Sequence, residues 1–296
     1  MSGRAELVPL FRELGNLKRI TSAERTRSIA TRLFLQAWGA LAAGQEPPEV
    51  ARRTVAAALA AARLGDLDLA RLRELGLSEN EATTVLRAAF DEVASVLDPQ
   101  LAAELRHALG RELLAGQPPR VALLLAEQPR AGVTCPGKPR LMLEPAENHA
   151  EHCLAVAVYA VLLAPGYDAD PQTVFPAGLA HHFHNAFMPD SGFTGEVLLG
   201  GQLDQVIADA RERGIADLPA ALRPTIETAL VPIADDSSGD GQAFHAADVI
   251  DRVLEIEQHL TAASATMDSV LGDYELVHAG PVKAFHDATL REVGLL

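Results

Sequence analysis

The 296-residue sequence has few cysteines and few aromatic residues. Its two cysteines, Cys135 and Cys153, are too few for a disulfide framework and form no CxxC pair, so we expect free thiols in a reducing compartment. Aromatic residues make up 4% of the chain, whereas alanine, leucine, arginine and glutamate, which favour helices, dominate its first half. This composition predicts an all-helical protein.

Long apolar runs are also missing. The first residues, "MSGRAELVPLFRELGNLKR", contain no continuous apolar segment. The run "LAVAVYAVLLAP" from Leu154 is shorter than the roughly 20 residues that a membrane-spanning helix needs. We therefore expect no membrane association and a cytoplasmic location.

Basic residues are scarce in the second half of the chain. Residues 1–128 carry 16 basic and 16 acidic side chains, so the whole formal charge of −15 falls on residues 129–296. An acidic surface repels the phosphates of DNA and RNA, and no basic stripe offsets it. No nucleic-acid polymer is expected as a partner, whereas an acidic pocket can still bind a cation.

Residues 1–128 show the apolar periodicity of successive amphipathic helices. The segment "TSAERTRSIATRLFLQAWGALAAG" has Ser22 as a candidate N-cap and stops at Gly44, and the next helix follows Pro48. We expect a separate N-terminal helical domain that serves docking or dimerisation. A homodimer is therefore one expected assembly.

Two more helix starts in this half have specific cap signals. Ser78 and Glu81 have the spacing of a capping box, and Asp98 precedes a proline at the first helical position.

Candidate metal ligands do not gather in residues 1–128. The one histidine of this half, His107, is expected to be a surface or partly buried residue.

A proline-rich segment, "AGQPPRVALLLAEQPRAGVTCPGKPR", marks the expected domain boundary near residue 130. Helical patterns resume at "ENHAEHCLAVAVYAVLLA" and continue beyond "QAFHAADVIDRVLEIEQHL", and no convincing alternating strand interrupts them. The second predicted domain covers residues 129–296 and is a helical bundle.

Histidines gather in this second domain, where nine of the ten follow residue 148. The clusters are His149 with His152; His181, His182 and His184; and His245 close to Asp248. Residues three apart on a helix share a face, so each cluster is expected to direct a pair of side chains inward. Because a buried imidazole or carboxylate without a partner is costly, their convergence indicates a metal ion.

In order and separation, these clusters resemble the motifs of the HD-domain metal-dependent phosphohydrolase superfamily, most closely bacterial 5′-deoxynucleotidases of the YfbR type. "ENHAEHCLAVAVYAVLLA" is similar to the family's "ENVxEHSxxVA" helix, "GLAHHFHNAFMPD" to its "xxxHDxxExxxGD" segment, "FHAADVIDRVLEI" to its "xKxADxLxAYL" helix and "YELVHAGPVKAFHDA" to its closing segment. The likeness covers roughly residues 138–290. It implies an HD-type helical bundle with metal ligands at His152, His181 and Asp248.

One departure from the family pattern changes the implied ligand set. His182 stands where the family has the aspartate of its HD pair, and imidazole is itself a ligand for Zn, Co, Ni or Fe. We expect one divalent transition metal (Zn, Co, Mn, Ni or Fe). Its predicted ligands are His152, His181, His182 and Asp248.

A second departure concerns proton transfer. Asn185 stands where the family has a glutamate proposed as an acid–base residue, and Pro189 replaces the glycine before Asp190. An amide cannot carry a proton between groups. The acid–base step is therefore expected from Asp190, His184 or Glu151.

Two cations and an acidic stripe flank the predicted ligands. Lys138 and Arg140 precede the first ligand helix, where the family keeps substrate contacts, and either is expected to bind a phosphate group. Asp251 and Glu255 follow the last ligand on the same helical face, as a solvated stripe or as hydrogen-bond partners of the ligands. Cys153 is expected to be a buried inert thiol.

These features together predict a hydrolase of small phosphorylated metabolites, including nucleoside monophosphates, but two other functions fit the same residues. Some HD-fold proteins use iron pairs, and surplus histidines (His149, His184 and His245) would complete the second site of such an oxygenase, although residues 185–244 contain no histidine. Loss of the motif aspartate and glutamate instead fits a catalytically degraded HD domain that binds a ligand for signalling.

Overall fold

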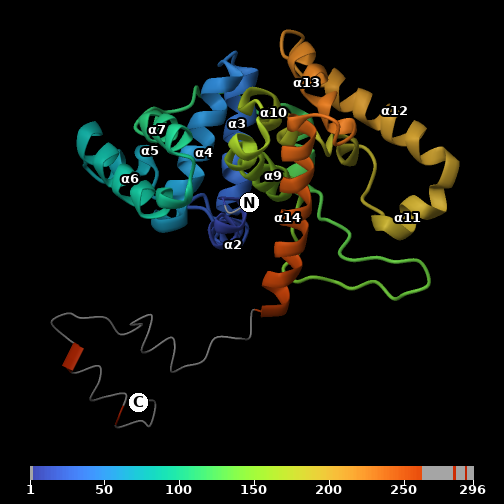
Figure 1. Ribbon diagram of the computed structural model, residues 1–296, viewed down its shortest axis with the longest axis horizontal. Helices are drawn as coiled ribbons and strands as arrows, with labels where there is room; N and C mark the ends of the chain where they lie inside the picture. The colour runs from blue at the N-terminus through green and yellow to red at the C-terminus, as the bar shows by residue number, and fades with distance from the viewer. Residues whose placement is uncertain (1–2, 262–282, 285–290, 292–296) are drawn as a thin grey trace. The chain divides into compact units, whose positions relative to one another are not determined.

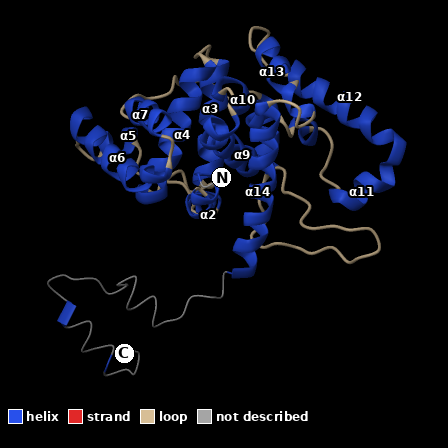
Figure 2. Ribbon diagram, in the orientation of Figure 1, coloured by secondary structure: helices blue, strands red, loops and turns tan. Residues whose placement is uncertain are grey.

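The computed structural model describes residues 3–261, 283–284 and 291. Figures 1 and 2 show that this part of the chain consists of helices joined by loops. Within these ranges there is no strand, and extended segments pair only through isolated bridges such as Val133 with Leu141. The all-helical class is confirmed for the described residues.

The described helices range from single turns to a 23-residue helix. The α-helices are α1 (Gly3–Glu6), α2 (Val8–Gly15), α3 (Ile29–Ala42), α4 (Pro47–Leu64), α5 (Leu69–Glu74), α6 (Glu79–Val93), α7 (Pro99–Ala108), α8 (Arg120–Glu127), α9 (His149–Leu163), α10 (Pro171–Ala180), α11 (Gly192–Leu199), α12 (Leu203–Ala216), α13 (Arg223–Leu230) and α14 (Gly239–Thr261). The 3-10 helices are η1 (Asn16–Lys18), η2 (Ala94–Val96), η3 (Ala164–Tyr167), η4 (Phe183–Ala186), η5 (Gly200–Gln202) and η6 (Pro232–Ala234).

Residues 1–256 form one compact unit, and a second unit begins at Glu257. In the first unit α9 contacts α3, α8 and α10. Figure 1 shows α3, α9 and α10 close together. Helix α4 packs on α3 and contacts α6 and α7, whereas α13 contacts α10 and α12 contacts η4. The sequence-based boundary near residue 130 lies inside this unit, where helices from both sides of it pack together.

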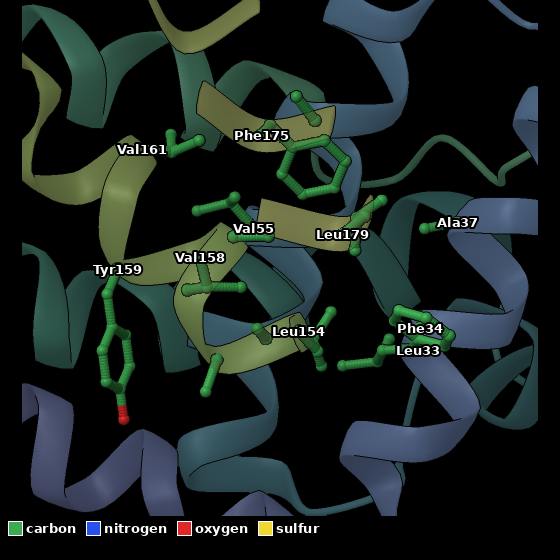
Figure 3. Packing of buried hydrophobic residues seen from close by; sticks show 14 of the residues in the cluster. Leu33, Phe34, Ala37, Val55, Leu154, Val158, Tyr159, Val161, Phe175 and Leu179 are labelled. Atoms are coloured by element: carbon green, nitrogen blue, oxygen red, sulfur yellow. The ribbon is translucent and has the colours of Figure 1, made fainter. Parts of the chain in front are cut away.

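The core of the first unit draws on both halves of its sequence. Figure 3 shows Leu33 and Phe34 of α3 beside Leu154 of α9 and Leu179 of α10, with Val55 of α4 in the same cluster. All five side chains are buried. Removing such apolar surface from water is the main favourable contribution to folding, so the two halves stabilise each other.

Helix α9 has no polar stripe, and neighbouring segments cover all of its faces. Each of its residues is buried, as expected for a helix without a polar stripe. By length and composition alone His149–Tyr167 could cross a membrane, but 83% of its most apolar window is buried inside the protein. A core helix of a globular protein passes the same test, so this is weak evidence for a membrane span.

Local cap signals explain where several helices begin. Ser78 and Glu81 form the expected capping box at the start of α6, and the side chain of Asp98 accepts backbone N–H bonds at the start of α7. A second capping box starts α9, where Asn148 and Glu151 each accept from the other's backbone N–H. This cap fixes the first turn of the helix that carries His149 and His152.

The start of α3 differs from the sequence-based expectation. Ser28 is the N-cap in place of Ser22, and its side chain accepts from the backbone N–H of Thr31. The preceding residues form a tight turn closed by a bridge between Thr21 and Ser28, with Arg25 at φ 62°. Several serines and threonines precede α3, so the cap signal alone did not identify the first helical residue.

Close packing of α9 on α10 depends on one glycine. A Cβ atom at Gly178 would lie 2.5 Å from the Cα atom of Ala157, which leaves no room for a side chain. The two backbones therefore approach closely. Their contact places the C-terminal end of α10 beside the first turn of α9, where the predicted metal ligands His152 and His181 lie.

Candidate metal centre

His152 lies in the first turn of α9 with a fully buried side chain. Its Nδ1 atom donates to Oδ2 of Asp251 at 2.8 Å. Its Nε2 atom lies on the other side of the ring, 3.2 Å from Oδ1 of Asp248 and 3.2 Å from Nε2 of His181. A carboxylate behind an imidazole fixes the ring orientation in the same way in metal sites.

His181 follows the last residue of α10. Its Nδ1 atom donates to the carbonyl oxygen of Gly178 at 2.7 Å, and its Nε2 atom lies 3.2 Å from Nε2 of His152. A carbonyl oxygen only accepts, so Nε2 of a neutral His181 carries no hydrogen. Its lone pair points at Nε2 of His152, where a hydrogen on that ring or a cation between the two rings would satisfy it.

His182 brings a third imidazole to the same place. The side-chain NH₂ of Asn185 donates to the carbonyl oxygen of Met188 at 3.3 Å, so its oxygen accepts from Nδ1 of His182 at 2.6 Å. One ligand-type atom from each of His152, His181 and His182 lies within 4.8 Å of the other two. We call these three residues the histidine triad; it is a group that could hold a metal ion.

Asp248, on helix α14, lies next to the triad. Its Oδ1 atom lies 3.2 Å from Nε2 of His152, and its Oδ2 atom lies 3.5 Å from Nη1 of Arg252. The Asp248 side chain is 21% exposed, and His181 and His182 are also partly exposed. The side of the triad next to Asp248 is thus open to solvent.

Burial and nearby charges hold these groups in the protonation states that bind metals. Burial lowers the pKa of His181 and of His182 well below the usual range, and the neighbouring imidazoles lower it further. Burial alone would raise the pKa of Asp248, but its interactions with His152 outweigh this effect and lower it. Neutral imidazoles and an ionised carboxylate are the forms that coordinate a metal.

A second group of ligand-type atoms lies behind His152. One such atom from each of Glu147, His152 and Asp251 lies within 4.8 Å of the others. The Nζ atom of Lys18 lies 2.6 Å from Oε1 of Glu147, 2.6 Å from Oδ1 of Asp251 and 3.5 Å from Oε2 of Glu255. We call Lys18, Glu147, Asp251 and Glu255 the lysine cluster.

The lysine cluster is a buried ion network in which each charge depends on the others. Burial alone would lower the pKa of Lys18, but Asp251, Glu147 and Glu255 raise it well above its usual range. Burial would raise the pKa of Glu147, but Lys18 and Arg130 lower it to about 2. Lys18 and Glu147 are therefore charged near neutral pH, and removing one of them would leave a buried charge uncompensated.

His149 lies beside the triad, with its ring centroid 4.8 Å from that of His182. Its Nε2 atom is 3.8 Å from Oδ2 of Asp190, which is too far for a hydrogen bond. Among the residues that the structure describes, neither ring nitrogen of His149 has a hydrogen-bond partner. Burial lowers its pKa to about 3, so the ring is neutral.

Asp190 is fixed by backbone amides near the triad. Its Oδ2 atom accepts from Ala131 N–H and its Oδ1 atom from Gly192 N–H, both at 2.9 Å. His184 lies on the same side, with its ring centroid 5.4 Å from that of His182. Burial, with a contribution from a nearby arginine, lowers the pKa of His184 to about 4.

Three other predicted site residues lie apart from the triad. Glu151 accepts from the Ser28 hydroxyl at 2.5 Å as well as from the backbone at the N-cap of α9, so it serves the helix start. Its pKa is raised by burial. Lys138 and Arg140 are exposed on the long segment between α8 and α9, where Arg140 donates to the carbonyl oxygen of Ala131 at 2.5 Å.

The helical spacing expected for His181 and His184 is wrong. Helix α10 ends at Ala180, so His181 and His184 do not share a helical face. His181 and His182 reach the same place because the chain leaves the helix between them. His245 and Asp248 lie three residues apart on α14 as expected, but the His245 side chain is exposed instead of pointing inward.

Two participants were missed by reasoning from the sequence. Lys18 is an isolated lysine in the N-terminal half, and no neighbouring ligand-type residue marks it. Glu147 precedes the capping residue Asn148 directly, and its position in "ENHAEH" was the only available signal. Both act through contacts with residues more than 100 positions away, such as the pair that they form with each other.

Comparisons with known proteins add no relative to this description. The chain matches no protein-family model, and no curated protein or solved structure is significantly similar to it.

Proposed function

We propose that this chain is a metal-dependent phosphohydrolase of the HD type, acting on a small phosphorylated metabolite such as a nucleoside monophosphate. The observation that carries the proposal is the close approach of Nε2 of His152 to Nε2 of His181 and to Oδ1 of Asp248, both at 3.2 Å. Ring nitrogens and a carboxylate that converge in this way match the ligands of a catalytic metal site with an open side.

The ligand set favours one divalent transition metal. Imidazole nitrogens from His152, His181 and His182 with a carboxylate oxygen from Asp248 suit Zn, Co, Mn, Ni or Fe. Each imidazole is oriented from behind by an acceptor, as ligands of bound metals usually are. When bound, such an ion supplies a Lewis acid for a phosphoryl oxygen and lowers the pKa of water.

Asp190 is the residue proposed to hold and deprotonate the attacking water. Two backbone N–H bonds fix its carboxylate, and His149 faces it with no hydrogen-bond partner among the described residues. A water molecule between Asp190 and His149 would satisfy both groups. Asn185 is a positioning residue here. Its side-chain oxygen accepts a hydrogen bond from Nδ1 of His182, and an amide does not transfer protons.

Arg140 is the cation proposed to bind the phosphate group. It donates to the carbonyl oxygen of Ala131, and the N–H of the same residue donates to Asp190. This short chain of contacts ties an exposed guanidinium to the proposed base, and guanidinium groups bind phosphate oxygens in pairs. Lys138 lies on the same segment as a second candidate.

Phosphate release from a panel of nucleotide and sugar monophosphates tests this function. The protein is purified without chelator, its metal content is measured, and each substrate is assayed with wild type, Asp190→Asn and His107→Ala. We expect release that needs the metal and falls at least 100-fold in Asp190→Asn, whereas the exposed His107 serves as the control. A metal-loaded protein that hydrolyses nothing in the panel would refute the proposal.

A ligand-binding module is the second candidate, and the role of Asn185 favours it. The residue at the position of the family's acid–base glutamate is committed to hydrogen bonds with His182 and Met188. Tight retention of a nucleotide without turnover would support this candidate. Two irons per chain with dioxygen consumption would instead support the oxygenase.

A further inference from the structure

The lysine cluster has the geometry of a cation site that is filled by a side chain. Glu147 and Asp251 each place an oxygen 2.6 Å from the Nζ atom of Lys18, and Glu255 places one at 3.5 Å. The Lys18 side chain is 2% exposed. Together with His152, two of these acids form a ligand group whose atoms lie within 4.8 Å of one another.

The carboxylates of the lysine cluster are ligands that suit a hard cation. Three carboxylates surround one ammonium group, and Ca²⁺ binds carboxylate oxygens at about 2.3–2.6 Å. The two shorter Nζ to oxygen distances are thus already close to those of a calcium site. The histidine triad differs, because imidazole ligands favour Zn, Co or Ni.

We propose that the ammonium group of Lys18 takes the place of a second divalent cation and, through Asp251, orients His152 toward the histidine triad. Asp251 is the link, because Oδ1 contacts Lys18 while Oδ2 accepts from Nδ1 of His152. Lys18 is therefore a positioning residue that limits the centre to one ion. The orienting part of the proposal rests on the proposed metal triad, whereas the cation-substitution part stands on the lysine cluster alone.

Shortening Lys18 exposes the site that its ammonium group occupies. In Lys18→Ala, three carboxylates lose their shared cation, and space opens beside them. Arg19, which pairs with Glu255, and Arg130, which pairs with Glu147, offset only part of this charge. A divalent cation then compensates the rest, and water fills its remaining coordination positions.

The test is Ca²⁺ binding to the full-length, Zn-loaded protein, followed by calorimetry and by thermal unfolding with and without Ca²⁺. We expect about one additional Ca²⁺ per chain in Lys18→Ala and none in wild type or Lys18→Arg. Arg106→Ala, which breaks an exposed pair with Asp91, is the control for loss of a cation elsewhere. The Tm of Lys18→Ala should rise with Ca²⁺, and that of wild type and control should not.

The Zn²⁺ affinity of the histidine triad is measured separately. This affinity should fall at least 10-fold in Lys18→Ala and recover in part in Lys18→Arg. If Lys18→Ala binds no Ca²⁺ and gains no stability from it, the substitution idea is wrong, even if the variant is poorly folded. If wild type binds no transition metal yet Lys18→Ala binds Ca²⁺, the proposed function fails while the substituted site stands.

Discussion

The Nε2 atom of His152 lies 3.2 Å from Nε2 of His181 and equally close to Oδ1 of Asp248. Groups with acceptor atoms that converge in this way need a positive partner, either a ring hydrogen or a cation. Asp251 and the Gly178 carbonyl oxygen hold the far sides of the two rings. The arrangement could hold a metal ion.

Replacing His181 should remove the metal. His181→Ala deletes one of three imidazoles of the triad, whereas His149→Ala deletes a neighbouring imidazole that lies outside the group. We expect elemental analysis to find little metal in His181→Ala and most of it in His149→Ala. Equal loss from both variants would mean that the ligands are assigned wrongly.

Removing the support of one ligand should weaken binding without abolishing it. In Asn185→Ala the imidazole of His182 loses the acceptor of its Nδ1 hydrogen. We expect metal affinity to fall by about 10–100-fold, the usual effect of losing such a supporting contact. Competition with a chromophoric chelator measures this, with the exposed Asn80→Ala as control, and unchanged affinity would count against His182 as a ligand.

Filling the contact between α9 and α10 should destabilise the whole unit. Gly178→Ala adds a methyl group 2.5 Å from the Cα atom of Ala157, so the free energy of unfolding should fall by about 1–3 kcal/mol. Gly201→Ala is the matched control, because within the described part of the chain no heavy atom outside its own chain neighbours lies within 4 Å of the added carbon. Urea unfolding compares the two, and equal effects would refute the close packing.

Acid should destabilise the metal-free protein partly through His149. Its pKa is about 3 in the folded chain and about 6.5 when unfolded, so only the unfolded state binds this proton at intermediate pH. The free energy of unfolding therefore falls as pH drops below about 6.5 and stops falling, for this group, near 3.

The matched variant for this effect is His149→Gln, which has no titrating group. With chelator present, wild type should lose more stability than His149→Gln between about pH 7 and pH 5. Urea unfolding at each pH measures the difference. Parallel losses in both proteins would show that His149 is not held neutral by burial.

Local signals in the sequence predicted much of the fold. The capping pair Ser78 and Glu81 and the cap Asp98 appear where expected because they act on backbone groups two or three residues away. The cap of α3 was misplaced because several residues before Ser28 are equally able to cap a helix. Local signals in the sequence thus predicted which segments are helical better than they predicted where each helix begins.

The site was predictable where its residues lie in motifs and not where they lie alone. His152, His181 and His182 come together as expected, and Asp248 contacts His152. Lys18 could not be identified from the sequence, because packing between distant segments determines its partners. Glu151 takes part in the capping box at the start of α9, and its predicted acid–base role stays a prediction.

An anomalous-scattering map of the crystalline protein, grown without chelator, tests the metal centre most directly. We predict a strong peak at the absorption edge of a transition metal, within bonding distance of Nε2 of His152 and Nε2 of His181 and beside Asp248. A map without a peak there, with the two rings turned to bond protein groups instead, would contradict it.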